Sequence, residues 1–242
     1  MKVYVVGIGP GDEQQMTPRA TEALARSNVI AGYEGYIRLI RDKFADKRFI
    51  ATGMTKEQDR CMAALAEAAA GNTVSMVCSG DAGIYGMAGL MLELAQSFED
   101  IQVEVVPGVT AASSGGALLG APLGHDFAVI SLSDLLTPWE VIEKRLRAAA
   151  QADFAVCLYN PSSHKRSGYL KKACEIIMQY RKPGAICGIA RNIGREGESY
   201  RVITLAELKD TEVDMFSTVF IGNSQTKEIG GRMVTPRGYR DV

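Results

Sequence analysis

The sequence predicts an α/β protein, and two observations carry this prediction. Short runs of β-branched residues alternate with segments of helical periodicity along nearly the whole chain. Several of these runs, such as TVSMVC and FAVCLY, are apolar at consecutive positions, as strands are when helices cover both faces of a sheet. The length of 242 residues is enough for one large α/β domain or two smaller ones.

The expected elements follow one another in order along the chain. The sequence predicts strands at residues 2–8, 28–31, 48–51, 73–78, 102–106, 128–132, 154–159, 185–190, 200–204 and 218–221. It predicts helices at residues 17–26, 56–70, 88–97, 138–149 and 164–180. The segment SSGGALLGAPLG, residues 113–124, is rich in glycine and small residues and separates two such series. We therefore expect an N-terminal α/β domain of residues 1–119 and a C-terminal α/β domain of residues 120–242.

Composition narrows the class of protein. The formal net charge is −1, so no excess of positive charge is there to attract nucleic acid or an anionic membrane. The five cysteines form no CxxC pair, which fits buried free thiols in a reducing compartment better than disulfides or zinc ligands. No run of about 18 apolar residues is present, and the N-terminus enters a strand without a leader-like segment. We expect a cytoplasmic protein with no nucleic-acid partner, no membrane partner and no bound metal.

The turn GIGPGD after the first strand nearly matches a dinucleotide-binding fingerprint. Gly7 and Gly9 occupy the first two glycine positions, but Asp12 stands where the third glycine belongs, and its carboxylate would repel a pyrophosphate. No GK[ST] follows, which excludes a Walker A loop. On its own this turn fits a tight strand-to-helix connection as well as it fits a binding loop.

Two further loops point to a ligand. CSGDAGIYG follows the fourth expected strand and VVPGVTAASS follows the fifth, so that all three loops lie at the carboxyl ends of strands, where open α/β sheets bind ligands. None of them carries Lys or Arg, and their only charges are those of Asp12 and Asp81. The loops therefore favour a cationic or neutral ligand over a polyanion. S-adenosylmethionine, a sulfonium with a zwitterionic amino-acid end, is such a ligand.

In this order and near these spacings, GIGPGD, SGDAGIYG and PGVTA resemble the loops of the tetrapyrrole methylase family, the class III S-adenosylmethionine-dependent methyltransferases. The C-terminal half adds HDFAVISLSDLLTPW, LYNPSS, IARNIGREGE and MVTPRGY. With these segments, essentially the whole chain resembles the precorrin-3B (cobalt-factor III) C(17)-methyltransferase subfamily of cobalamin biosynthesis. One departure is Ala82, where many members have proline, and we expect it only to loosen the turn.

The resemblance implies a fold and a reaction. Members have the tetrapyrrole methylase fold, two α/β domains with the cofactor cleft between them, and form homodimers. They transfer a methyl group from S-adenosyl-L-methionine to C-17 of a tetrapyrrole macrocycle and leave S-adenosylhomocysteine. The subfamily also contracts the macrocycle, extruding the former C-20 carbon as an acetyl group. The resemblance leaves open whether the substrate is metal-free precorrin-3B or the cobalt-bearing cobalt-precorrin-3.

Carried onto this chain, the resemblance implies a set of cofactor-binding residues. They are Pro10, Gly80, Asp81, Ile84, Thr110, Ala111, Tyr159 and Asn192. Gly80 and Asp81 would take the methionine end of the cofactor, and Tyr159 and Asn192 would enclose the adenine. Helix capping is the alternative role for Asp81 and for Thr110.

Ring contraction moves protons, so acid–base groups are expected near the substrate. His125, beside Asp126 in the expected interdomain loop, is the first candidate, with a surface turn as the alternative. Asp134, at the end of the next strand, is a further catalytic candidate, with helix capping as its alternative.

The substrate carries many carboxylates, which arginine forks suit. The candidates for substrate binding are Asp12, Ser133, Arg166, Arg191 and Arg195, and Lys165 adjoins this set. For the arginines and the lysine, the alternative is an ordinary solvated surface.

Two other functions stay open on the sequence. A precorrin-2 or precorrin-4 methyltransferase, or a diphthine synthase, would share the cofactor loops, and the HDFAVISLSD and TPRGY segments discriminate against them. A non-catalytic dinucleotide-binding module would bind NAD in place of S-adenosylhomocysteine, and Asp12 argues against it.

Overall fold

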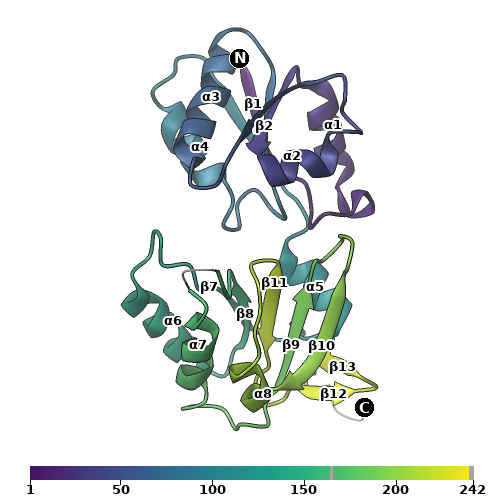
Figure 1. Ribbon diagram of the computed structural model, residues 1–242, viewed down its shortest axis with the longest axis vertical. Helices are drawn as coiled ribbons and strands as arrows, with labels where there is room; N and C mark the ends of the chain where they lie inside the picture. The colour runs from purple at the N-terminus through teal and green to yellow at the C-terminus, as the bar shows by residue number, and fades with distance from the viewer. Residues whose placement is uncertain (164–165, 240–242) are drawn as a thin grey trace. The chain divides into compact units, whose positions relative to one another are not determined.

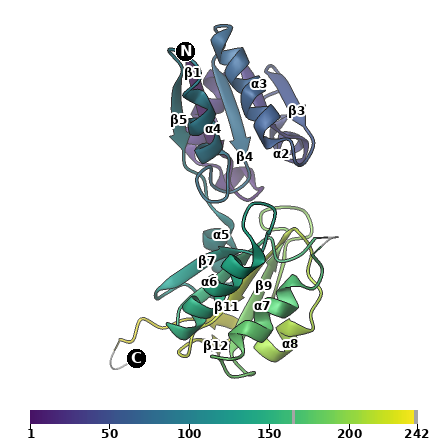
Figure 2. The same ribbon diagram turned by 90° about the vertical axis from the view of Figure 1, so that its left-hand side faces the viewer.

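The computed structural model describes residues 1–163 and 166–239. It confirms the α/β class, and the chain forms two compact units, Met1–Thr110 and Ala111–Val242 (Figures 1 and 2). All ten expected strands are present, with their ends displaced by no more than two residues.

The first unit is a doubly wound sheet of five parallel strands. The strands are β1 (Lys2–Gly7), β2 (Val29–Tyr33), β3 (Arg48–Thr52), β4 (Val74–Cys78) and β5 (Gln102–Val106), in the order β3-β2-β4-β1-β5. The helices are α1 (Pro18–Arg26), α2 (Glu34–Ile40), α3 (Glu57–Ala69) and α4 (Ala88–Ala95), preceded by a short 3-10 turn, η1 (Glu13–Gln15). Helices α1 and α2 pack on one face of the sheet, and α3 and α4 pack on the other.

Alternate side chains of each central strand bury into opposite helical layers. Val3 and Val5 of β1 pack with α3 and α4, whereas Tyr4 and Val6 pack with α1 and α2. A strand buried on both faces must be apolar at consecutive positions, which is the pattern in the sequence of β1 and β4. The loop after β1 leads to α1 on one face, and the loop after β4 leads to α4 on the other face. Open α/β sheets bind ligands where neighbouring strands diverge in this way.

The second unit has a mixed sheet. Its strands are β7 (Phe127–Ser131), β8 (Ala155–Tyr159), β9 (Ile186–Arg191), β10 (Ser199–Thr204) and β11 (Ser217–Ile221), in the order β10-β9-β11-β8-β7. Strands β7 and β8 are parallel, and β11 runs antiparallel to both β8 and β9. The helices are α5 (Ala111–Leu119), α6 (Trp139–Gln151), α7 (Tyr169–Ile177) and α8 (Leu205–Lys209). A small sheet joins β12 (Lys227–Ile229), β13 (Arg232–Val234) and β6 (Gly120–Ala121).

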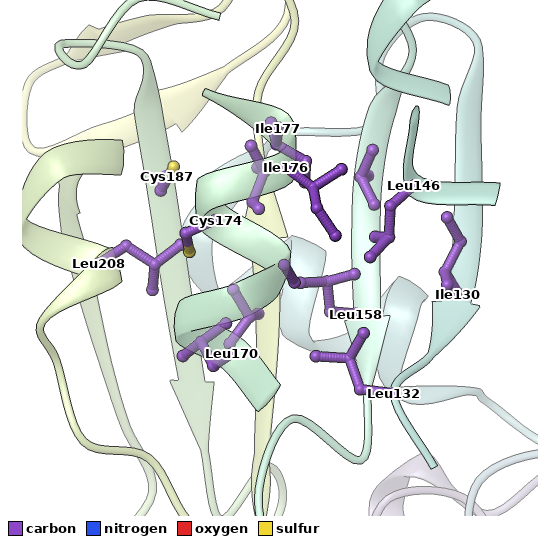
Figure 3. Close-up of a cluster of buried hydrophobic side chains, with 14 of the residues drawn as sticks. Ile130, Leu132, Leu146, Leu158, Leu170, Cys174, Ile176, Ile177, Cys187 and Leu208 are labelled. Carbon is purple, nitrogen blue, oxygen red and sulfur yellow. The ribbon is translucent and has the colours of Figure 1, made fainter. Parts of the chain in front are cut away.

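Two apolar layers cover this mixed sheet. Helices α6, α7 and α8 bury one face, where Leu146 and Leu170 pack against the strand residue Leu158 (Figure 3). Helix α5 buries the other face, where Leu119 packs with Phe220 of β11. Both faces of β8 and β11 are therefore covered, and all five residues of β11 are buried.

The glycine-rich segment 113–124 forms α5 and β6. Its small residues serve close packing, because a Cβ atom at Gly115 would lie 2.9 Å from Ile193 Cδ1 and 3.2 Å from the Cβ of Ala190. Helix α5 belongs with the second sheet, so the compact units divide between Thr110 and Ala111, upstream of the boundary at 119/120 that the sequence suggests.

Other sequence predictions meet the structure with small changes. The helix expected at 164–180 is present as α7, while residues 164 and 165 lie outside the described residues. The elements that were not predicted are η1, α2, α5, α8, β6, β12 and β13. The prediction of buried free thiols is confirmed for all five cysteines. In the part of the chain that the structure describes, no helix is long and apolar enough to cross a membrane.

The core of the second unit gives a first prediction. Leu158 is fully buried among the residues of Figure 3, so Leu158→Ala removes apolar contacts and leaves a cavity. We expect a loss of about 2–5 kcal/mol in the free energy of unfolding, measured by urea denaturation. Leu136→Ala, at a side chain that is 97% exposed, is the control and should change stability by less than about 0.5 kcal/mol. Equal losses in the two variants would contradict the packing described here.

Candidate active site

The three loops that the sequence singles out lie next to one another. Strand β1 is flanked by β4 and β5, and all three strands run parallel, so the loops after them leave the same edge of the sheet. This juxtaposition joins residues about 70 and 100 positions apart in the chain, as the register pairs Val3 with Val74 and with Val103.

The backbones of the three loops are interlocked. Gly9 and Gly80 exchange two hydrogen bonds, from Gly9 N to Gly80 O at 3.1 Å and from Gly80 N to Gly9 O at 2.7 Å. A Cβ atom at Gly108 would lie 2.2 Å from the carbonyl oxygen of Gly80 and 2.6 Å from the carbonyl carbon of Gly7. Only glycine fits at this crossing, so position 108 is fixed by its neighbours on the other two loops.

Asp81 ties two of these loops together. Its Oδ1 accepts hydrogen bonds from the amides of Gly83 at 2.8 Å and Ile84 at 3.1 Å, and its Oδ2 accepts one from the amide of Gly108 at 2.9 Å. Helix α4 begins at Ala88 with Met87 at its N-cap, so Asp81 does not cap it. A carboxylate has room for about four hydrogen bonds, so Asp81, with three donors among the residues that the structure describes, can still accept one from a cationic group. Contact with the methionine end of a cofactor stays a prediction.

The other expected cofactor residues of the first unit surround this clamp. Pro10 is buried directly after Gly9, and Ile84 is 40% exposed beside the Asp81 turn. Thr110 directly precedes α5. Asp12 accepts a hydrogen bond from the amide of Gln14 and caps η1, which gives it a structural role besides the expected one toward substrate.

The expected residues of the second unit also meet at one edge. Strands β7, β8 and β9 run in the same direction. At their carboxyl ends, Asp134 lies three residues after β7, Tyr159 is the last residue of β8, and Asn192 directly follows β9. The hydroxyl of Tyr159 accepts a hydrogen bond from the amide of Ala112 at 2.7 Å, near the N-terminus of α5, which Ala111 begins. Asn192 adopts a left-handed conformation at φ 51°, and its carbonyl accepts a hydrogen bond from the amide of Arg195.

The expected arginines are engaged with the protein itself. Arg166 donates from Nη1 to the carbonyls of Leu132 and Asn160, both at 3.1 Å, and so ties the ends of β7 and β8. Arg191 pairs with Asp214, with 2.7 Å between Nε and Oδ2. Lys165 lies outside the described residues. Roles toward substrate carboxylates stay predictions for this group.

Asp134 has a partner that sequence reasoning missed. The hydroxyl of Tyr169 donates to Asp134 Oδ2 at 2.6 Å, across 35 positions of the chain. Ser133, next to Asp134, donates its amide to Ser131 Oγ at 3.2 Å. The local sequence does not predict this contact, because Tyr169 lies in the first turn of α7 and reaches Asp134 only when α7 packs beside the end of β7.

His125 and Asp126 lie at the other edge of the sheet. They precede β7, and the carbonyl of Asp126 accepts a hydrogen bond from the amide of Ala155 at the start of β8. The five residues of β7 separate this edge from Asp134 by ~16 Å. The structure therefore does not bring His125 and Asp134 together, and the acid–base role of His125 and Asp126 stays a prediction.

Four left-handed residues other than glycine lie at the carboxyl edges of the two sheets, whereas Asp100 and Asp153 precede β5 and β8 at the amino edges. Thr55 follows β3, Tyr85 follows β4, and Asn160 and Asn192 follow β8 and β9, all with φ between 51° and 59°. Residues other than glycine rarely adopt this conformation, and such strain is concentrated at ligand sites. These loops are therefore candidates for binding in both units.

Cys78, the cysteine at the start of the second loop, does not provide a reactive thiol. Burial raises the pKa of Cys78, at the end of β4, to about 12, so its thiol stays protonated and accepts a hydrogen bond from the amide of Met87. Within residues 1–163 and 166–239, no three His, Cys, Asp or Glu residues are grouped so as to hold a metal ion.

Comparison with known proteins identifies the family. Residues 2–209 match the family model described as Tetrapyrrole (Corrin/Porphyrin) Methylases. The chain therefore belongs to the tetrapyrrole methylase family, as the three loops and the C-terminal segments predict.

Individual relatives are similar over nearly all of this chain. A probable cobalt-factor III C(17)-methyltransferase of Salmonella typhimurium is 47% identical, over 97% of this chain and 98% of that protein. A cobalt-factor III methyltransferase of Priestia megaterium is 43% identical over 99% of this chain, which spans 45% of that longer protein.

Solved structures have the same fold. The methyltransferase CobJ superposes with a TM-score of 0.89 at 37% identity, over 97% of this chain and 99% of that one. The uroporphyrin-III C-methyl transferase of Thermus thermophilus, solved with S-adenyl homocysteine, superposes with a TM-score of 0.71 at 24% identity, over 92% of each chain.

The glycine crossing gives a second prediction. Gly108→Ala places a methyl group against the backbones of the other two loops, so the loops must separate. We expect S-adenosylhomocysteine to bind at least about tenfold more weakly, measured by calorimetric titration. In Gly89→Ala no atom lies within 4 Å of the new Cβ, and the helix gains up to ~1 kcal/mol of stability with unchanged binding. Unchanged binding in Gly108→Ala would show that the crossing does not shape the site.

Asp81 gives a third prediction. In Asp81→Asn one of the three amide donors meets an NH2 group, and the charge is lost. Hydrogen bonds to a charged group contribute about 1.5–3 kcal/mol, so affinity for S-adenosylhomocysteine should fall about tenfold to a hundredfold. Asp100→Asn, at a left-handed position that Asn tolerates, is the matched control. Affinity equal to the wild type in Asp81→Asn would contradict the clamp.

Proposed function

We propose that this protein transfers the methyl group of S-adenosyl-L-methionine to C-17 of a cobalt-bearing factor III macrocycle, with contraction of the ring, in cobalamin biosynthesis. Family membership and the names of the full-length relatives support the reaction class and the cobalt-bearing substrate. The observation that carries the proposal is the interlocked set of three loops at one edge of the first sheet.

The chemistry of these loops fits the cofactor. Residues 7–12, 78–86 and 105–114 contain no Lys or Arg, and Asp12 and Asp81 supply negative charge. A sulfonium and an α-ammonium group are attracted to such a surface, whereas a pyrophosphate is repelled. The expected ligands toward this cofactor are Pro10, Gly80, Asp81, Ile84, Thr110, Ala111, Tyr159 and Asn192.

The main contribution of the protein to methyl transfer is to align the methyl donor with the substrate. When bound, S-adenosyl-L-methionine supplies a methyl group that is open to in-line displacement. Alignment of two reactants can contribute ~7–11 kcal/mol to the rate, and it requires loops that do not move. The Gly9–Gly80 hydrogen bonds, the Gly108 crossing and the Asp81 clamp supply this rigidity.

A binding and turnover experiment tests the proposal. We expect about one equivalent of S-adenosylhomocysteine per chain in a calorimetric titration, and no binding of NAD. With S-adenosyl-L-methionine under anaerobic conditions, the cobalt-bearing substrate should gain one methyl group by mass, and carbon-labelled NMR should show the new acetyl group. Turnover of metal-free precorrin-3B alone would move the protein to the metal-free route, and NAD binding without S-adenosylhomocysteine binding would overturn the proposal.

Assembly and location are further parts of the proposal. By analogy with the family we propose a homodimer in the cytoplasm. Light scattering of the purified protein tests the dimer, and a mass of one chain would refute it.

A further inference from the structure

We infer that Asp134 is the proton acceptor for the macrocycle, with Oδ1 as the reacting oxygen, and that Tyr169 is the residue that positions it. This inference rests on the proposed function, because it names the groups that handle the proton which ring contraction moves.

The two oxygens of Asp134 have different surroundings. Oδ2 accepts the hydrogen bond from Tyr169 at 2.6 Å. Oδ1 accepts no hydrogen bond from the residues that the structure describes, and Arg166 Nε lies 3.8 Å from it. The Asp134 side chain is 33% exposed. One oxygen is therefore held, and the other is open to a ligand.

Packing holds both members of the pair. Asp134 comes two residues after Leu132, and Tyr169 directly precedes Leu170; both leucines belong to the buried cluster of Figure 3. The Tyr169 ring lies 4.6 Å from the Trp139 ring, centroid to centroid. A surface pair without such anchors would lose conformational entropy on forming, whereas here the neighbours place the two groups beforehand.

Charged groups lie around the pair, and the Tyr169 phenol keeps its proton. The hydrogen bond to the Asp134 carboxylate raises the pKa of Tyr169 above its ordinary value of 10, so the phenol remains a donor at neutral pH. Arg166 faces Asp134 from the segment before α7, with its Nε 3.8 Å from Oδ1. Among the residues that the structure describes, Glu140 of α6 and Lys172 of α7 also lie near the pair, and Lys172 Nζ is 5.2 Å from the Tyr169 ring centroid.

In the proposed step, a proton passes from the substrate to the Asp134 carboxylate. A proton leaves an O–H or C–H group of the substrate for Oδ1 of ionised Asp134, and its bonding electron pair stays on the substrate atom. Tyr169 keeps its own proton and donates more strongly to the ionised carboxylate than to the protonated one. The site also lies at the carboxyl ends of the parallel strands β7 and β8, where α/β sheets bind ligands, whereas His125 lies at their amino ends.

The test is the variant Tyr169→Phe, which keeps the ring and removes only the hydroxyl. We expect methyl transfer and S-adenosylhomocysteine binding within about twofold of wild type, and ring contraction slowed about tenfold. Contraction should slow through kcat while the KM for the macrocycle stays unchanged, because the Tyr169 hydroxyl positions the carboxylate and does not touch the substrate. Tyr200→Phe, on the edge strand β10, is the matched control and should match wild type.

Two Asp134 variants separate chemistry from folding. Asp134→Asn should slow ring contraction by about 10²–10⁴-fold. Asp134→Glu should restore part of this rate, because it restores a carboxylate. Thermal melts of each variant check that the fold is intact.

Each contrary result has a definite meaning. An unchanged kcat for contraction in Tyr169→Phe, or contraction in Asp134→Asn at the wild-type rate, overturns the inference, as does loss of contraction in His125→Ala alone. If the wild-type protein methylates its substrate while these variants contract it normally, only this inference falls. If the wild-type protein methylates no tetrapyrrole, the proposed function falls with it.

Discussion

The crossing of three backbones at Gly7, Gly80 and Gly108 is the constraint on which the first unit depends. There the loops after β1, β4 and β5 approach so closely that a single methyl group would separate them. The Gly9–Gly80 hydrogen bonds close two of the loops, and the Asp81 carboxylate draws in the third through Gly108. Because the parallel sheet fixes where each loop leaves it, the arrangement of the three loops is set by the sheet order and by backbone contacts.

In the second unit, hydrogen bonds from side chains hold the segments at the carboxyl edge of the sheet together. Arg166 joins the ends of β7 and β8 through two carbonyls, and Tyr169 holds Asp134 beside them. Tyr159 reaches from β8 to the amide of Ala112 near the start of α5. Each of these links starts from a residue next to the packed core, which keeps the polar edge ordered while part of it faces solvent.

The sequence predicts what is locally encoded and misses what depends on partners far along the chain. Strands that are buried on both faces have apolar residues at consecutive positions, so the sequence predicted the ends of the strands to within two residues. Helix α5 was not recognised, because Gly115 and its neighbours read as a linker until Ile193 and Ala190 pack against them. The motifs GIGPGD, SGDAG and PGVTA predicted three neighbouring loops, but the sequence did not show the contact from Asp81 to Gly108 or the one from Tyr169 to Asp134, which span 27 and 35 positions. His125 was a candidate because it adjoins Asp126 in the expected interdomain loop, and its role stays a prediction.

The position of β1 in its sheet has a consequence for biosynthesis on the ribosome. Strand β1 is made first but pairs only with β4 and β5, whereas β2 can pair with β3 as soon as both have emerged. The apolar segment VYVVG must therefore wait without partners until residues 74–78 and 102–106 have been synthesised. At ~5–20 residues per second this interval lasts several seconds, during which a nascent chain offers a chaperone or a neighbouring chain an unpaired strand. The same topology that brings the three glycine-rich loops together from distant segments thus delays their assembly until the whole first unit has left the exit tunnel.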